Sequence, residues 1–395
     1  MTARRVLISG AGIAGPALAH WLAAAGDDVT LVERAPTLRE GGQAVDFRGS
    51  VHRAVLEQMG LWEAIVERRT RPGDLLLVDR RDRVRATLPA AMMAGDVEIV
   101  RGDLCRLLYE RTLASTRYRF DDRIVRLDDR GDLVSVEFER GAPETFDLVV
   151  GADGLRSGVR ALAFGDESRV LRHHGYRIAS FGMAALSGRE RAAVSYCEAG
   201  RGLMVSPISP ERARALLVYT DRSGAPHPRD PLAQKRLLEA RFSGMGWRAP
   251  EVLEGLHASS DLYVDTIATV HLPRYARGRI VLVGDAAYGG TLGGQGTPLA
   301  IVGAYVLAHE LARTTDLPEA LARYEGRLRP YATRCQKGAI RSGEFFAPRT
   351  RLGVALRDRL YAVLTSRLLA ATFERLIRSA ASDFSLPDYA TGSIA

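Results

Sequence analysis

The chain has 395 residues, of which 46% are hydrophobic, so it can bury a sizeable core, in two domains rather than one. Its formal net charge is +8, but only two of the 55 basic residues are lysines, and the arginines alternate with acidic residues instead of forming a stripe. This pattern argues against nucleic-acid binding. Apolar runs are shorter than the roughly 20 residues that cross a bilayer, and no signal-peptide pattern opens the chain, so we expect a cytoplasmic enzyme.

The first predicted unit is a strand, a helix and a strand within residues 4–33. Gly10, Gly12 and Gly15 lie between the first strand and the helix in the spacing G-x-G-x-x-G. Glycines at these positions permit a tight turn, close approach of a pyrophosphate, and close packing of helix on strand. Glu33 ends the second strand, where a carboxylate accepts hydrogen bonds from ribose hydroxyls. The unit therefore predicts a dinucleotide site at the N-terminus of the helix.

Two later segments also place an aspartate directly after a predicted strand. Residues 144–160 form a strand that enters Ala152-Asp153-Gly154 and then a basic, helix-prone stretch. Residues 283–300, VGDAAYGGTLGGQGTPLA, follow the strand GRIVL and precede a helix. A plain corner between strand and helix needs neither the aspartate nor so many glycines, so this segment predicts a ligand contact.

The three segments in this order resemble the class A flavoprotein monooxygenases, the para-hydroxybenzoate hydroxylase superfamily, near its actinobacterial tetracycline-inactivating and polyketide-tailoring members. The resemblance covers nearly the whole chain. It implies an α/β fold in which a Rossmann-type FAD-binding domain carries an inserted β-sheet substrate domain and a C-terminal helix. The expected FAD-binding domain comprises residues 1–70, 96–166 and 273–332. Residues 71–95 and 167–272 would form the substrate domain, and residues 333–395 a C-terminal helical segment.

The resemblance also assigns cofactor contacts to individual residues: Gly10, Gly12, Ala14, Gly15, Glu33, Arg34, Arg48, Arg101, Asp153, Asp285, Gly294, Gly296 and Thr297. In the family pattern Arg101 reaches the diphosphate and ribityl region of FAD, Asp153 contributes to both FAD and passing NADPH, and Asp285 holds the ribityl chain. Arg48 matches a stretch near the flavin ring, and a surface arginine is an equal alternative. No catalytic base can be named.

Physical reasons support the segment around Asp285. A polyol chain needs a hydrogen-bond acceptor, and Gly293, Gly294 and Gly296 let backbone approach the edge of a flat ring because no Cβ intervenes. Thr297 and Pro298 then fit the N-cap and the first position of the next helix. That helix would direct its positive end at the flavin, where negative charge accumulates on reduction.

The segments between these motifs predict a second sheet. Strand-like runs occur within residues 169–220 and 259–272, interrupted by one helix-like segment. Possible cavity-wall residues are Phe181, Met183, Tyr196, Met204 and Tyr219, although core packing is the stronger expectation for each. His173 and His174 have no metal-ligand companions, and Cys105, Cys197 and Cys335 are too scattered for a disulfide framework, so no metal site is expected.

The tail carries leucines at four-residue spacing, which predicts an amphipathic helix. They are Leu352, Leu356, Leu360, Leu364 and Leu368. We expect this helix to dock against the two main domains, with binding to an anionic membrane as the alternative.

The resemblance implies hydroxylation or other oxygenation of an aromatic or polyketide-type small molecule, with FAD as cofactor, NAD(P)H as transient cosubstrate, and oxygen transferred from a flavin C4a-hydroperoxide. The loop after Asp285 departs from the family pattern, since Tyr288 replaces a histidine and Thr291 stands where a proline is usual. A second hypothesis is therefore an enzyme that holds FAD but catalyses a non-redox step such as cyclisation. The substrate, the choice between NADH and NADPH, and the oligomeric state are left open by the sequence.

Overall fold

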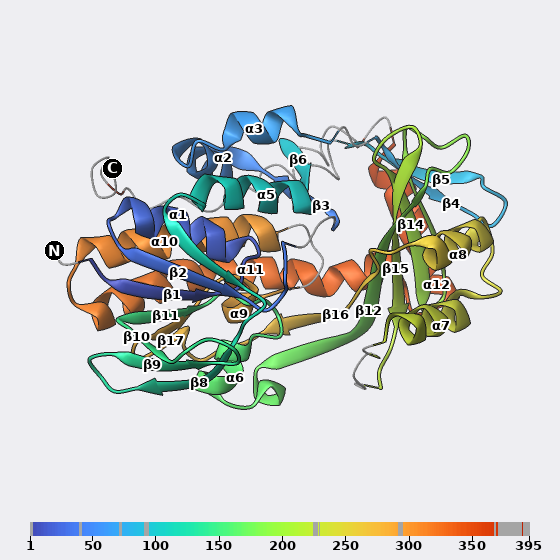
Figure 1. Ribbon diagram of the computed structural model, residues 1–395. Helices are drawn as coiled ribbons and strands as arrows, with labels where there is room; N and C mark the ends of the chain where they lie inside the picture. The colour runs from blue at the N-terminus through green and yellow to red at the C-terminus, as the bar shows by residue number, and fades with distance from the viewer. Residues whose placement is uncertain are drawn as a thin grey trace.

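The computed structural model describes residues 3–38, 42–70, 73–90, 95–223, 228, 230–290, 295–366, 369 and 389, without the side chains of residues 339 and 340. Two sheets stand side by side, joined by long strands and one long helix (Figure 1).

The first sheet has six strands, of which five are parallel. Their order is β17 (Ala276–Arg277), β18 (Ile280–Leu282), β11 (Leu148–Gly151), β1 (Arg5–Ser9), β2 (Asp28–Glu33) and β7 (Thr116–Phe120). The central strand β1 buries Val6, Leu7 and Ile8 completely. Helices cover both sides of such a strand, which is why its sequence is a continuous apolar run and not an alternating one.

Helices surround this sheet (Figure 1). They are α1 (Ala14–Ala24), α2 (Gly49–Gln58), α3 (Trp62–Glu67), α5 (Arg101–Thr112), α6 (Gly158–Phe164), α9 (Asp285–Tyr288) and α10 (Gly296–Arg313), with a 3-10 turn at Glu167–Arg169. Two small antiparallel sheets flank it: β8 (Ile124–Asp129), β9 (Val134–Phe138) and β10 (Glu144–Phe146), and the pair β3 (Ala44–Phe47) and β6 (Val97–Val100). Helix α10 is buried along most of its length, so its apolar sequence reflects a central helix.

The second sheet has seven strands in the order β16, β12, β15, β14, β13, β4, β5. Their bounds are β16 (Tyr263–Val270), β12 (Leu171–Ala184), β15 (Arg212–Thr220), β14 (Arg201–Pro207), β13 (Ala193–Glu198), β4 (Leu75–Val78) and β5 (Val84–Leu88). Helices α7 (Pro231–Phe242) and α8 (Ala249–Ala258) cover one face, and the first sheet lies beyond the other face (Figure 1).

The expected wall residues divide between the two faces of this sheet. Phe181, Tyr196 and Tyr219 are buried in the core beneath α7 and α8, and Met183 packs against that core. Met204 lies on the opposite face, against Phe346 and Tyr361 of the C-terminal helices. Core packing therefore explains all five residues, on one face of the sheet or the other, because alternate residues of a strand point to opposite faces.

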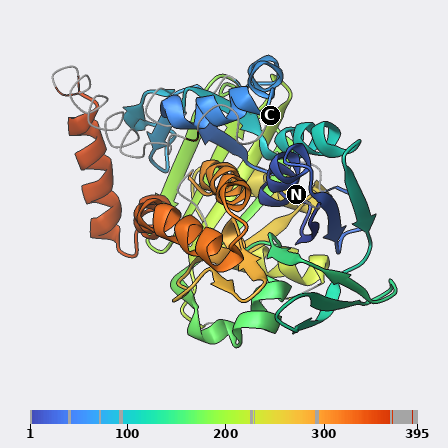
Figure 2. The ribbon, with the colours of Figure 1, turned by 90° about the vertical axis from the view of Figure 1, so that its left-hand side faces the viewer.

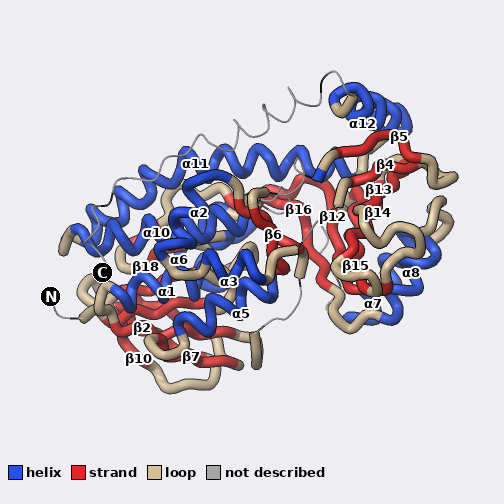
Figure 3. The backbone as a smooth tube through the Cα atoms, turned by 90° about the horizontal axis from the view of Figure 1, so that it is seen from above, coloured by secondary structure: helices blue, strands red, loops and turns tan. Residues whose placement is uncertain are grey.

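Helix α11 (Leu317–Phe346) runs without interruption from the first sheet to the second (Figure 3). It crosses residue 333, where the sequence suggested that a separate C-terminal segment begins. Because the helix has an amphipathic pattern along its whole length, it packs on both sheets, and no break occurs at that point.

Helix α12 (Arg351–Leu364) follows and stands at the margin of the molecule (Figure 2). The helix docks on the second sheet, as expected, but three of its leucines face solvent. Leu352, Leu356 and Leu360 are 68%, 59% and 55% exposed, whereas Arg357 is 8% exposed. The helix packs through the face that carries Arg357 and Tyr361, and Leu368 lies outside the described residues. The leucine periodicity indicated a helix correctly but not which face is buried.

Candidate functional site

The predicted ligand-binding segments meet at one edge of the first sheet. Strands β1, β2, β11 and β18 are parallel, so their carboxyl ends lie together. Glu33 is the last residue of β2, and Gly10, Asp153 and Asp285 follow the ends of β1, β11 and β18. In open α/β sheets, ligands bind at this edge, where the chain leaves the central strand in both directions.

The glycine loop after β1 is shaped by close contacts. Gly10 has φ +110°, and a Cβ on it would lie 2.6 Å from the carbonyl oxygen of Ala152. A Cβ on Gly15 would lie 2.0 Å from the carbonyl oxygen of Gly10, so this position cannot accept a side chain without moving the backbone. A Cβ on Gly12 would meet only the guanidinium of Arg101, at 3.6 Å. Gly10 and Gly15 therefore serve packing, and Gly12 leaves space in front of the loop.

Helix α1 begins behind this loop with no side chain capping its N-terminus. Its first turn contains no acidic residue, so the free N–H groups and the positive end of the helix dipole face the loop. Ala14 stands in this first turn, and its Cβ would lie 2.8 Å from a Cβ on Gly284. Ala14 is thus part of the close contact between α1 and the strand end at β18.

Glu33 links the loop to the end of β2. Its carboxylate accepts hydrogen bonds from the backbone N–H of Ala11 at 2.8 Å and of Ala35 at 2.9 Å. Each carboxylate oxygen can accept a second bond, so the group holds the loop and still has acceptor capacity. The next residue, Arg34, is exposed.

Arg101 opens helix α5 and extends across the glycine loop. Its backbone N–H donates to the carbonyl of Gln43 at 3.0 Å, which fixes the start of the helix. Its aliphatic stem lies against Gly42, where an added Cβ would be 3.2 Å from Cβ of Arg101, and its guanidinium reaches the space in front of Gly12. This places a cation at the edge where an anionic ligand would lie.

Asp153 forms hydrogen bonds within the turn that follows β11. Its carboxylate accepts hydrogen bonds from the hydroxyl of Ser157 at 2.5 Å and from the backbone N–H of Val159 at 3.1 Å. These bonds hold the turn that packs against Gly10. The structure therefore gives Asp153 a direct role in shaping the site.

Arg160 is a supporting residue that the sequence analysis missed. It is 1% exposed, and its guanidinium donates to the carbonyl oxygens of Leu155 at 2.6 Å and Ala286 at 2.9 Å. It thereby joins the Asp153 turn to the residue after Asp285. Its position in a basic stretch gave no sign of burial, because a buried arginine requires acceptors that only the tertiary fold supplies.

Asp285 has an exposed side chain and a raised pKa. The side chain is accessible, and no described residue donates a hydrogen bond to it. Desolvation by surrounding protein nevertheless raises its pKa to about 6, with Asp265 adding to the rise and Arg101 opposing it. The carboxyl group is therefore accessible although protein surrounds it, and the open space in front of it is called the recess.

Helix α10 begins beside Asp285. A Cβ on Gly296 would lie 3.6 Å from Oδ1 of Asp285, so glycine keeps this space narrow but open. The N-cap is Gln295, without a side-chain cap, and Thr297 and Pro298 lie inside the first turn. The prediction of Thr297 as N-cap is therefore wrong, because the helix already begins at Gly296. Gly293 and Gly294 lie outside the described residues.

Arg48 is partly buried and is hydrogen-bonded to its neighbours. It precedes α2, and its Nε donates to Oδ2 of Asp46 at 2.6 Å. Its backbone N–H donates to Nδ1 of His52, whose Nε2 lies 2.8 Å from the hydroxyl of Tyr331. The residue is partly buried and paired, which does not agree with a free surface arginine.

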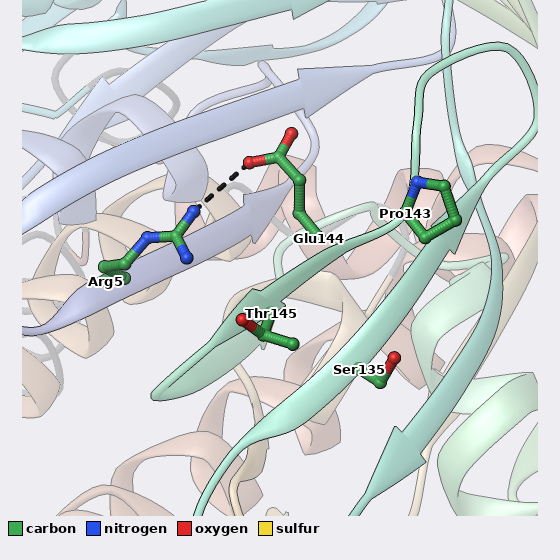
Figure 4. Close-up of a pocket in the computed structure, with 5 residues that line it drawn as sticks. All are labelled: Arg5, Ser135, Pro143, Glu144 and Thr145. Atoms are coloured by element: carbon green, nitrogen blue, oxygen red, sulfur yellow. Dashed lines mark hydrogen bonds and ion pairs between the residues drawn. The ribbon is translucent and has the colours of Figure 1, made fainter.

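Other features of the described chain do not form a second centre of this kind. The described residues contain no cluster of His, Cys, Asp or Glu that could hold a metal, and Cys105, Cys197 and Cys335 are free. No helix in the described part is long and apolar enough to cross a membrane. A shallow cavity of about 370 Å³ is lined by Arg5, Ser135, Pro143, Glu144 and Thr145 (Figure 4). It lies at the amino end of β1, the end opposite to the glycine loop.

Comparison with known proteins agrees with this geometry. A family model described as an FAD-binding domain matches residues 3–339. A flavin-dependent monooxygenase of Legionella longbeachae is 32% identical over 393 residues, covering 98% of each chain. An uncharacterized protein of Mycobacterium tuberculosis is 39% identical over 342 residues, covering 84% of this chain and 92% of that protein.

A solved structure extends the similarity to three dimensions. The crystal structure of the tetracycline destructase Tet(51) superimposes with a TM-score of 0.83 at 30% identity, covering 98% of this chain and 99% of that one. The chain belongs to the FAD-dependent monooxygenase family. This FAD-dependent monooxygenase has the para-hydroxybenzoate hydroxylase-like α/β fold, so the predicted family, fold class and enzyme class are confirmed.

Proposed function

We propose that this monooxygenase uses NAD(P)H and O₂ to hydroxylate or otherwise oxygenate an aromatic or polyketide-type small molecule. The observation that carries the proposal is Asp285, an accessible carboxylate in a recess, next to two helix N-termini that no side chain caps. Such a constellation fits a ligand with both hydroxyl and phosphate groups. FAD has both.

The residues present fit FAD as follows. The N-terminus of α1 and the guanidinium of Arg101 would hold the pyrophosphate, since both are positive and both face Gly12. Glu33 would accept the adenosine ribose hydroxyls with its remaining lone pairs. Asp285 would accept the ribityl hydroxyls, which would replace the hydrogen bonds that the described residues do not provide.

When bound, FAD would supply the electron transfer and oxygen activation, which amino-acid side chains cannot carry out. The chain's own contribution is binding and electrostatics. The first turn of α10 presents free N–H groups and the positive end of its dipole next to Asp285, and this would favour negative charge on a neighbouring ring. The second sheet, on the far side of the recess, would position the substrate and exclude water.

The nature of the substrate is supported by the relatives. The structural relative at 30% identity is named a tetracycline destructase, and this chain covers nearly its whole length. NAD(P)H would bind only transiently, because the one G-x-G-x-x-G unit of this chain is assigned to FAD. We also propose that FAD binds through the expected cofactor residues and that the chain divides into the expected domains.

The first test is flavin retention. The purified protein should be yellow, and Asp285→Ala should lose most of its FAD, since a hydrogen bond to a charged acceptor contributes about 1.5–3 kcal/mol. FAD content is measured from absorbance after gel filtration. Asp132→Ala, in the exposed loop between β8 and β9, is the control and should keep its flavin. A colourless wild type that also fails to bind added FAD would contradict the proposal.

The second test separates oxygenation from a non-redox reaction. Turnover of tetracycline and related polyketides should require both NAD(P)H and O₂, and substrate should accelerate NAD(P)H oxidation. If product forms at an undiminished rate without oxygen and without NAD(P)H, the reaction is not an oxygenation, and the cyclase-like hypothesis is supported instead.

A further inference from the structure

Strand β16 carries a hydrogen-bonded pair, Tyr263 and Asp265, that none of the cofactor contacts above uses. The hydroxyl of Tyr263 donates to Oδ2 of Asp265. In the antiparallel ladder Tyr263 is opposite Ser180 and Asp265 is opposite Ile178. The neighbouring residues Ala179 and Val264 pack in the core beneath α7 and α8, so alternation places the pair on the other face. That face looks toward the first sheet (Figure 1).

The pair faces the recess that contains Asp285. Tyr263 is 44% exposed, but surrounding protein still raises its pKa well above the ordinary value by desolvation, with Asp265 as the next cause. Arg101 lowers this pKa and Asp285 raises it, and Asp265 in turn raises the pKa of Asp285. The geometry agrees with these effects, because Thr269 of β16 bridges to Gly290, just after α9, so this strand lies beside the helix that begins with Asp285.

The position of β16 relative to the candidate FAD site is fixed by hydrogen bonds. The backbone N–H of Val270 donates to the carbonyl of Gly289 at 2.9 Å, directly after α9. The amide of Gln336 donates to the carbonyl oxygens of Val270 at 2.6 Å and Tyr288 at 3.1 Å. The strand that carries Tyr263 is therefore attached at its other end to the helix that begins with Asp285.

The hydrogen bonds of the pair indicate which of its atoms can accept a hydrogen bond from a ligand. Oδ1 of Asp265 accepts from the backbone N–H of Thr266 at 2.7 Å, and Oδ2 accepts from Tyr263. Because the hydroxyl hydrogen of Tyr263 is directed at Asp265, its oxygen presents lone pairs to the recess. A hydroxyl that donates to a carboxylate is also polarised into a better acceptor.

We propose that Tyr263 is a specificity-determining residue that accepts a hydrogen bond from a phenolic or enolic hydroxyl group of the substrate, and that Asp265 is its positioning residue. The inference rests on the proposed function and names the chemical group that the substrate must present. A site arranged for a donor discriminates against an analogue that lacks it, because the analogue leaves a buried polar group without a partner.

The experiment uses the FAD-loaded protein and two probes, 2,6-dihydroxynaphthalene and its dimethyl ether, with binding followed by the change in flavin fluorescence. Wild type should bind the dihydroxy compound at least about tenfold more tightly than the ether. Tyr263→Phe should reduce this preference to about twofold or less, and Asp265→Asn should reduce it in part. Since Tyr263 stays protonated, the wild-type preference should not change between pH 7 and 8.

The matched control is Tyr219→Phe on the opposite face of the same sheet, where the buried hydroxyl has no hydrogen-bond partner among the described residues. This variant should keep the wild-type preference. A wild type that binds both probes alike, or neither, or a Tyr263→Phe variant with an unchanged preference, overturns the inference. FAD content and NAD(P)H oxidation are measured on every variant, so a failure of the proposed function is recognised separately.

Discussion

Asp285 is a residue whose environment opposes its charge, and this has a consequence for stability. Its pKa is raised from 3.8 to about 6, chiefly by desolvation. The folded chain therefore binds this proton more tightly than the unfolded chain does. Between pH 3.8 and about 6 the free energy of unfolding should fall as pH rises, because the ionised form is disfavoured in the fold.

Asp285→Asn should consequently stabilise the flavin-free protein at pH 8 and have little effect at pH 4. The measurement is the melting temperature of the flavin-free wild type and variant across this range. The same variant should bind FAD more weakly, since the amide has no charge to offer the ribityl hydroxyls. An equal difference in melting temperature at both pH values would show that ionisation of Asp285 is not responsible.

Two glycines of the loop are expected to have different roles, Gly15 in packing and Gly12 in leaving space for a ligand. Gly15→Ala should destabilise the protein by about 1–3 kcal/mol, because its Cβ would lie 2.0 Å from the carbonyl oxygen of Gly10. Gly12→Ala should leave stability nearly unchanged, since its nearest neighbour is 3.6 Å away, but should reduce FAD binding. Denaturant unfolding of the flavin-free variants and FAD titration separate the two effects. Equal destabilisation by both changes would contradict this division.

Among the elements, α12 is attached to the second sheet by a buried arginine. Nη1 of Arg357 donates to the carbonyl of Phe345 at 2.9 Å and contacts Sγ of Cys197 at 2.6 Å, and its other side pairs with Asp358 at 2.5 Å. The pKa of Cys197 is raised by burial, with Arg357 opposing the rise, so a neutral thiol and an ion pair coexist there. Arg357 thus has its donors satisfied inside the protein.

Arg357→Ala should therefore loosen α12 and lower the free energy of unfolding by about 3 kcal/mol, since Asp358 loses its partner. Leu356→Ser, on the exposed face, should change it by about 0.5 kcal/mol or less. Limited proteolysis after α11 measures how firmly α12 is held, and denaturant unfolding measures the free energy of unfolding. A larger loss from Leu356→Ser than from Arg357→Ala would place the docking face on the leucine side.

At the scale of the whole molecule, β12, β16 and α11 connect the two sheets. Gly343 of α11 packs on Tyr176 of β12, where an added Cβ would be 2.5 Å from the ring. Three such connections make separate unfolding of the sheets unfavourable. We expect one cooperative transition, in which flavin release and loss of helical signal coincide.

Two glycines of α11 test this coupling. Gly343→Ala should destabilise the protein by about 1–3 kcal/mol and shift both transitions together. Gly338→Ala, in an exposed position with no atom within 4 Å of its added Cβ, should stabilise it by up to about 1 kcal/mol through helix propensity. Circular dichroism and flavin fluorescence during thermal unfolding are the measurements. Two separate transitions would show that the helix does not couple the sheets.

The sequence by itself determined the family, the fold class and the four strand ends that form the candidate site. Each of these depends on local order: a strand, then a glycine or an aspartate, then a helix. Such patterns are visible because tight turns and helix starts restrict residue type over a few positions. The second sheet was also visible from its strand-like runs, although not which residues lie on which face.

Only the tertiary structure decided the features that depend on distant contacts. The burial of Arg357 and Arg160 requires carbonyl acceptors from other elements, and the exposure of Leu356 follows from the burial of the opposite face. The proximity of Tyr263 to Asp285 arises because β16 leaves one sheet and ends beside α9 of the other. Periodicity reports that a helix has two faces, but which of them is buried depends on the groups that the rest of the chain brings against it.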